Sequence, residues 1–175
     1  DYLPQVSQGR VAGHDYHGDH RQPMAADSIL GKGDMGRVVC ATRGGKASVR
    51  TQDAAIALVQ ERGDELAFLF VVDVCFLKRS RRAVRPGVVA DEMARMGAFL
   101  LQMAQQRASA QGVASDVLLR RGHLRAELEA TIREYGADVL VLGKPAAGSS
   151  AYALEELQHL AAGIEAETAA KVLIL

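Results

Sequence analysis

From residue 37 onward, apolar residues follow two alternating patterns. Short runs of mostly apolar residues, which are typical of buried strands, occur at 38–42, 66–74, 139–142 and 172–175, and a third, shorter strand is predicted at 116–121, where 117–119 are apolar. Between these runs, apolar residues recur every three or four positions, which predicts helices at 48–62, 89–111, 124–135 and 154–164. The chain is therefore expected to form five strands that alternate with four helices.

Local signals support the predicted helix ends. Ser48 is the predicted N-cap of the first helix, because its hydroxyl can accept from an unpaired backbone N–H. Three of the helices are followed by a glycine, at Gly63, Gly112 and Gly136. The second helix is the longest, and the residues that recur along it are Met93, Met96, Leu100, Met103 and Arg107.

This alternation, which contains no hairpin signal, predicts an α/β fold: a doubly wound five-stranded parallel sheet with helices on both faces. In such sheets ligands bind beyond the carboxyl ends of the strands, where the strand order reverses. The candidate ligand- or nucleotide-binding residues are those that end or follow the first four strands: Thr42, Arg43, Gly44, Gly45, Lys46, Val72, Asp73, Arg121, Gly122, Gly143, Lys144, Gly148, Ser149 and Ser150.

Residues 1–36 differ from the rest of the chain. They are rich in glycine, hold most of the histidines and show neither a strand nor a helix period. We expect a tail or linker at 1–36, ordered only by a partner, and one folded domain at 37–175. The letters of 31–36 match G-x-G-x-x-G, but this segment precedes the first strand, whereas the dinucleotide fingerprint follows a strand.

Three histidines in this tail, His14, His17 and His20, have a spacing that would suit zinc or nickel. No cysteine and no periodic scaffold accompanies them, so an incidental tract is the favoured interpretation. We predict no metal site.

Composition narrows the class of protein. Of 175 residues 49% are hydrophobic, and 21 basic side chains balance 21 acidic ones, so a packed core is expected and nucleic-acid binding is not. The longest apolar run, 66–72, is far shorter than the roughly 20 residues of a membrane span, and no signal peptide is recognisable. Cys40 and Cys75 stand alone in apolar settings, which favours a reducing cytoplasm. The first residue is Asp1, which leaves open a longer parent protein.

Several segments, in this order, carry a family resemblance. They are 38–48, Phe70-Val71-Val72-Asp73, Arg121-Gly122-His123 followed by Ala126-Glu127, the stretch 135–143 (YGADVLVLG), and Glu167-Thr168-Ala169. Together they resemble a universal stress protein (UspA-like) domain over residues 37–175. The resemblance implies a five-stranded α/β fold, frequent dimerisation through the last strand and, in one branch of the family, ATP binding.

The ATP-binding branch has an acidic residue after the first strand and a Gly-x2-Gly-x9-Gly-Ser/Thr loop after the fourth. Here Arg43 takes the acidic position, and after Gly143 the next glycines are Gly148 and Gly163, the latter followed by Ile164. ATP or another adenine nucleotide is therefore an open but not a favoured cofactor.

Positive side chains replace the usual motif. Arg43, Lys46, Arg121 and Lys144 all follow predicted strands, and the backbone at 148–150 precedes the fourth helix. Cations and helix-start amides suit an anion or an altered nucleotide. The competing interpretation is that these are solvated surface charges.

No pair of acid and base groups and no activated nucleophile is recognisable, so an enzyme is not predicted. We expect a non-catalytic regulatory or stress-response domain, with a homodimer through 172–175. One alternative is a cytoplasmic module of a larger membrane transporter, suggested by the tail and by five cations at 78–85 that suit anionic lipid or an acidic partner. The other is a slow ATPase.

Overall fold

The computed structural model describes residues 35–73, 86–145 and 154–175, and Gly33–Leu175 form one compact unit. The histidine tract, the basic segment 78–85, Cys75 and the candidate residues Gly148, Ser149 and Ser150 lie outside the described residues, as does the predicted tail up to residue 34.

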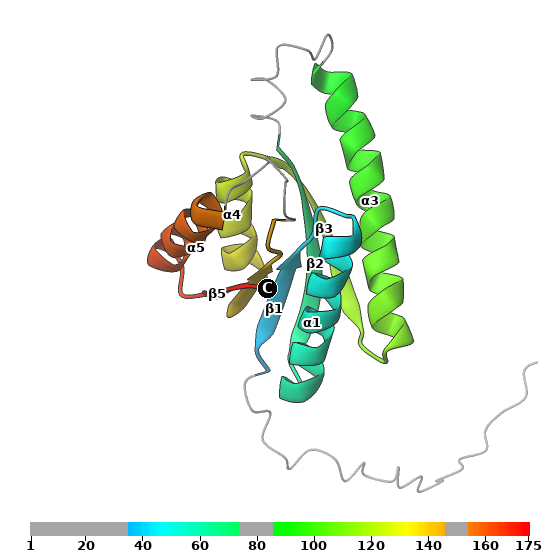
Figure 1. Ribbon diagram of the computed structural model, residues 1–175, viewed down its shortest axis with the longest axis vertical. Coiled ribbons are helices and arrows are strands. Elements are labelled where there is room, and N and C mark those ends of the chain that lie inside the picture. Colours follow the sequence, from blue (N-terminus) through cyan, green and yellow to red (C-terminus); the bar gives the residue numbers. More distant parts are fainter. Residues whose placement is uncertain (1–34, 74–85, 146–153) are drawn as a thin grey trace, which may run out of the picture. The chain divides into compact units, whose positions relative to one another are not determined.

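The described residues form one parallel sheet with strand order β3-β2-β1-β4-β5 (Figure 1). Along the chain the elements are β1 (Arg37–Ala41), α1 (Lys46–Arg62), β2 (Glu65–Asp73), α3 (Pro86–Ala110), β3 (Ser115–Gly122), α4 (Leu124–Tyr135), β4 (Val139–Leu142), α5 (Leu154–Glu167) and β5 (Lys171–Ile174). The predicted fold class, a five-stranded parallel α/β sheet with helices on both faces, is confirmed.

The start of α1 differs from the prediction. The helix begins at Lys46 after Gly45, and Ser48 lies inside its first turn, where its hydroxyl donates to the Gly44 carbonyl at 2.8 Å. The predicted Ser48 cap is therefore wrong. Two consecutive glycines with positive φ turn the chain into the helix before Ser48 is reached, so no side-chain cap forms.

Two apolar clusters lie on opposite faces of the sheet. Successive residues of β1 alternate between them, with Val38 and Cys40 in one cluster and Val39 in the other. The first cluster includes residues of α1 and α3, and the second includes residues of α4 and α5, which Figure 1 shows on the other side of the sheet. Burial on both faces explains why the central strands are continuous apolar runs.

The helix α3 contacts the sheet through small residues and Leu101. Its buried positions are Ala90, Ala94, Leu101, Ala104 and Ala108. Gly97 lies so close to the sheet that a Cβ atom there would be 2.5 Å from the Phe70 ring. Of the residues whose spacing predicted this helix, Met96 and Met103 are exposed. The helix was predicted correctly, but those two methionines do not mark its buried face.

Cys40 provides a test of the core. Its side chain is fully buried, and burial raises the pKa of the thiol from 9.0 to about 12. In a Cys75→Ser variant, the remaining thiol is expected to stay unreactive toward an aromatic disulfide reagent until urea unfolds the chain. Rapid labelling of the native protein would contradict this burial.

The same thiol predicts a pH dependence of stability. The folded state keeps the proton on Cys40 up to about pH 12, whereas the unfolded state loses it above about pH 9. The contribution of Cys40 to the free energy of unfolding is therefore expected to be complete below pH 9 and to fall as the pH rises toward 12.

Candidate functional site

The strand order reverses between β1 and β4, which are neighbours in the sheet although they are far apart in sequence. Their last residues, Ala41 and Leu142, are paired in register. The segments that follow them, beginning at Thr42 and Gly143, therefore leave the sheet side by side. This is the position at which open α/β sheets bind ligands.

The segment after β1 is shaped by Gly44 and Gly45, whose φ angles are 82° and 86°. A Cβ on Gly44 would be 2.7 Å from a methyl carbon of Leu100, so this loop lies directly against α3. No atom lies within 4 Å of the corresponding position on Gly45. The loop thus brings the first turn of α1, which contains no acidic side chain, to the carboxyl edge of the sheet.

Thr42 holds the start of this loop in place through two hydrogen bonds. Its backbone N–H donates to the Leu69 carbonyl at 2.8 Å, and its hydroxyl accepts from the amide of Gln52 at 2.9 Å. Thr42 and Gln52 are both buried. Thr42 therefore supports the site from within the protein. Sequence reasoning did not find Gln52, because nothing in the helix pattern marks a polar residue that turns inward.

The segment after β4 lies against α1. A Cβ on Gly143 would be 2.7 Å from the hydroxyl oxygen of the buried Thr51, so only glycine fits at this point without displacement. The backbone N–H of Lys144 donates to the carbonyl of Leu175 at 2.7 Å, which fixes the chain to the end of β5. Together these contacts hold the start of the segment after β4 against α1 and the end of β5.

Three of the four predicted cations follow β1 and β4 at this edge of the sheet. Arg43, Lys46 and Lys144 are exposed, and none forms an ion pair with another residue in the described ranges. Arg121 does not join them. It lies on the edge strand β3, three strands away from β4 or roughly 14 Å, and its guanidinium is bonded to the carboxylate of Asp91 at 2.7 Å.

The other candidates also lie toward the β3 edge. Val72 and Asp73 of β2 are in register with Arg121 and Gly122. Val72 is buried, and Gly122 lies against the side chain of Glu127. These residues lie at the carboxyl ends of β2 and β3, on the side of β1 away from β4.

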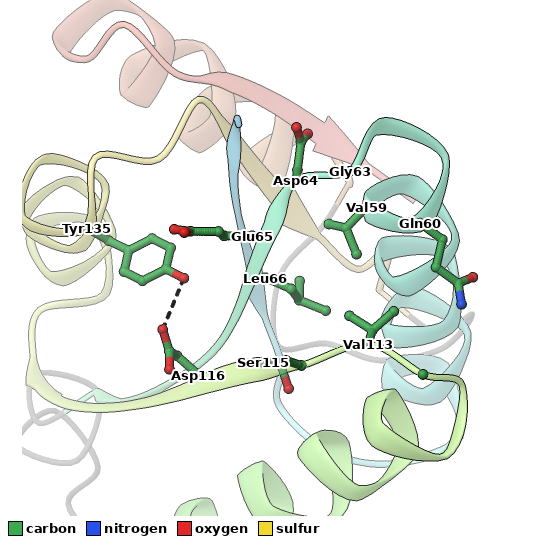
Figure 2. A pocket seen from close by; sticks show the side chains of 12 residues that line it. Val59, Gln60, Gly63, Asp64, Glu65, Leu66, Val113, Ser115, Asp116 and Tyr135 are labelled. Carbon is green, nitrogen blue, oxygen red and sulfur yellow. Dashed lines mark hydrogen bonds between the residues drawn. The ribbon is translucent and has the colours of Figure 1, made fainter. Parts of the chain in front are cut away.

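An open groove of about 640 Å³ occupies the opposite edge, at the amino ends of β2 and β3, and sequence reasoning missed it. Figure 2 shows Tyr135 and Asp116 meeting across this groove, where the phenol donates to the carboxylate at 3.2 Å. Burial, followed by the charge of Asp116, raises the pKa of Tyr135 to about 12. No motif in the sequence relates these two residues, which lie 19 positions apart on β3 and on the helix α4 that follows it.

The acidic residues around this groove form hydrogen bonds or ion pairs with other residues of the chain. The carboxylate of Asp64, only 5% exposed, receives an ion pair from Arg62 at 2.7 Å and a hydrogen bond from the N–H of Gly36 at 3.0 Å. Across 35–73, 86–145 and 154–175, no cluster of side chains suits a metal ion. This edge therefore fastens the start of β1 to α1, and we place the candidate site at the carboxyl edge.

Within the same described ranges, no helix has both the length and the apolar character required to cross a membrane.

A profile of the universal stress protein family matches residues 35–154. Among solved structures, a member of that family from Burkholderia pseudomallei is 23% identical, with a TM-score of 0.62 over 79% of this chain and 94% of that chain. A universal stress protein in complex with cAMP is also 23% identical, with a TM-score of 0.53 over 80% and 95% of the two chains.

A universal stress protein from Archaeoglobus fulgidus in complex with dAMP is 15% identical, with a TM-score of 0.52 over 80% of this chain and 96% of that chain. No curated protein matches the chain significantly. At these identities the solved structures establish a shared fold.

Proposed function

Because the chain belongs to the universal stress protein family, we propose that it is a non-catalytic regulatory domain that binds a nucleotide or a related anionic ligand at the carboxyl ends of β1 and β4. The observation that carries this proposal is the group of exposed cations, Arg43, Lys46 and Lys144, around a glycine loop at the point where the strand order reverses.

The chemistry of Arg43 favours an anion at this position. In the ATP-binding branch of the family, the corresponding position is a carboxylate, which accepts hydrogen bonds, whereas a guanidinium only donates them. The ligand is therefore expected to place an acceptor, such as a phosphate oxygen, near the end of β1. Glycine backbone at 44–45 allows such a group to approach closely.

Two proteins of the same fold were solved with cAMP and with dAMP, and both compounds are adenine nucleotides with a single phosphate. Adenine monophosphates are accordingly the first ligands to test. A single phosphate group also suits the limited set of cations after β1 and β4.

Binding is tested by calorimetric titration of the purified chain with cAMP, AMP, ATP and inorganic phosphate. Arg43→Ala and Lys144→Ala are each expected to weaken the binding of the preferred ligand by about tenfold or more, because each removes a charge-assisted hydrogen bond. The matched control is Lys171→Ala, which removes an exposed cation at the amino end of β5. The absence of binding by the wild-type chain, or equal loss in the control, would contradict the proposal.

The same samples test the alternative that the chain is a slow ATPase. A non-catalytic domain is expected to release no phosphate from ATP above the rate of the buffer. Release that disappears in Lys144→Ala would replace the regulatory proposal with an enzymatic one.

A further inference from the structure

The strand β3 forms one edge of the sheet (Figure 1). It has eight residues, and its register with β2 runs from Ser115 to Gly122 without a bulge. Natural edge strands are commonly short, bulged or interrupted by lysine or proline, which keeps them from pairing with another chain. β3 has no bulge, lysine or proline, and its centre, Val117-Leu118-Leu119, is apolar. This edge is therefore suited to pairing with a further strand.

The backbone groups of Val117 and Leu119 point away from the sheet. In β2, the carbonyl of Leu69 accepts from the N–H of Thr42 at 2.8 Å, so Leu69 bonds toward β1. Successive residues of a strand bond to opposite neighbours, so the β2 residues on either side of Leu69 bond to β3. Leu118 is in register with Leu69 and forms the bonds with these two residues. The N–H and C=O groups of Val117 and Leu119 are therefore directed outward.

Within the part of the chain that the structure describes, these outward groups have no partner. No hydrogen bond joins them to another residue of 35–73, 86–145 or 154–175. The side chains of Val117 and Leu119 are 40% and 39% exposed. A strand that approached this edge would meet unpaired donors and acceptors beside apolar side chains.

The charged side chains of β3 leave the edge open. Each has a partner on a flanking helix: Asp116 with Tyr135, Arg120 with Glu134, and Arg121 with Asp91. These partners belong to α4 and α3, which cover opposite faces of the sheet. The charges are thus satisfied within the chain, and pairing at the edge has to rest on backbone hydrogen bonds and apolar contacts.

We propose that β3 pairs in the antiparallel direction with β3 of a second copy of the chain, so that the two sheets become continuous. Leu118 lies at the two-fold axis, and Val117 of each copy lies opposite Leu119 of the other. The outward N–H and C=O groups of Val117 and Leu119 then exchange about four hydrogen bonds across the axis. The two Leu118 residues form the non-hydrogen-bonded pair between them.

The order of residues in β3 favours a second copy over an unrelated strand, because the strand is self-complementary in the antiparallel direction. With the axis at Leu118, Val117 meets Leu119 on one face and Leu118 meets Leu118 on the other, so apolar residues meet apolar residues on both faces. An axis one residue earlier or later would place Leu118 opposite Asp116 or Arg120. The apolar pattern therefore selects one register.

The other edge of the sheet, β5, is shorter and partly occupied within the chain. It has four residues, and the N–H of Val172 donates to the carboxylate of Glu165 at 2.8 Å. A copy that paired along β5, as the family resemblance implies, would have to displace Glu165. Pairing through β5 stays a prediction, and the test of the β3 interface has to separate the two edges.

The first experiment is sedimentation equilibrium of the full chain at increasing concentration. The wild-type chain is expected to dimerise, and Val117→Lys is expected to weaken dimerisation by at least about tenfold, because it places an ammonium group against Leu119 of the other copy. The matched control is Phe99→Lys, which adds the same charge at an exposed apolar side chain of α3. This control is expected to dimerise like the wild type.

Proline substitution tests the backbone directly and separates the two edges. Proline has no N–H and is tolerated in an edge strand where that N–H points away from the sheet. Val117→Pro is expected to weaken dimerisation by at least about tenfold, whereas Val172→Pro, the matched change on β5, is expected to dimerise like the wild type. Circular dichroism confirms that each variant is folded.

Cross-linking tests the register in a Cys75→Ser background. Leu118→Cys is expected to form a disulfide-linked dimer under mild oxidation, because the α-carbons of a non-hydrogen-bonded antiparallel pair are about 4.5 Å apart. The matched control is Arg120→Cys, on the same face of the same strand. Its two copies would lie about 14 Å apart along the strands, so it is expected to stay unlinked.

Four outcomes would overturn the proposal. A wild-type chain that stays monomeric shows that β3 does not pair with a second copy. A dimer that is kept in Val117→Pro but lost in Val172→Pro assigns self-association to β5. A dimer that is lost in Phe99→Lys but kept in Val117→Lys assigns it to α3. A dimer that is linked through Arg120→Cys and not through Leu118→Cys contradicts the register.

Discussion

Replacing Phe68 with alanine is expected to lower the free energy of unfolding by about 3–5 kcal/mol. Phe68 is among the largest fully buried side chains in the described residues. It lies in the middle of β2, in register with Cys40 of β1 on one side and Val117 of β3 on the other. Its removal leaves a cavity between the sheet and the helices α1 and α3, which the rigid strands on both sides cannot close.

This loss is large compared with the roughly 5–15 kcal/mol by which domains of this kind are stable. Urea denaturation followed by circular dichroism measures it directly. The matched control is Phe99→Ala, which removes the same side chain from an exposed position and is expected to change the stability of the monomer by less than about 0.5 kcal/mol. Similar losses for both variants would show that Phe68 does not lie in the core.

The strands were predictable because burial on both faces leaves a simple signature. β1, β2 and β4 lie inside the sheet, so nearly every residue in them is apolar and the runs at 38–42, 66–74 and 139–142 stand out from their surroundings. The ends of the helices were harder to predict than the strands. The first helix begins two residues before Ser48, since backbone geometry at Gly45 starts the helix without a side-chain cap.

The orientation of α3 could not be predicted from periodicity alone. Both a stripe of alanines and a stripe of large apolar residues recur at helical spacing along this segment, and hydrophobicity favours the large ones for burial. Close approach to the sheet decides otherwise. With Gly97 against Phe70 the helix lies close to the sheet at this turn, and Met96 and Met103 face outward, whereas Leu101 is buried.

The sequence predicted which residues lie at the carboxyl ends of the strands, but not which of these residues lie close together. Residues that follow strands lie at the carboxyl edge of a parallel sheet. This rule correctly placed Arg43, Lys46 and Lys144 at that edge. Which strands are neighbours is not encoded in any local pattern. The placement of β3 at the far edge separates Arg121 from the others, and Arg121 forms a hydrogen bond with Asp91 on α3, which is 30 positions away.

Replacing Gly97 with leucine is expected to lower the free energy of unfolding by about 1–3 kcal/mol, because the new side chain would overlap the ring of Phe70 and a methyl group of Leu119. Phe70 is buried in β2 and has no open space into which to move. The matched control lies in the same helix. Gly87→Leu adds the same side chain where no atom lies within 4 Å, and it is expected to stabilise the chain by up to about 1 kcal/mol through helix propensity.

A double-mutant cycle separates a direct clash from a general effect on the helix. In a Phe70→Ala background the cost of Gly97→Leu is expected to fall or to change sign, because the added side chain then fills the space that the ring has left. Urea denaturation of the four proteins gives the interaction energy. Equal costs in both backgrounds would mean that α3 packs through a different face. Met96, Phe99 and Met103 would then lie toward the sheet.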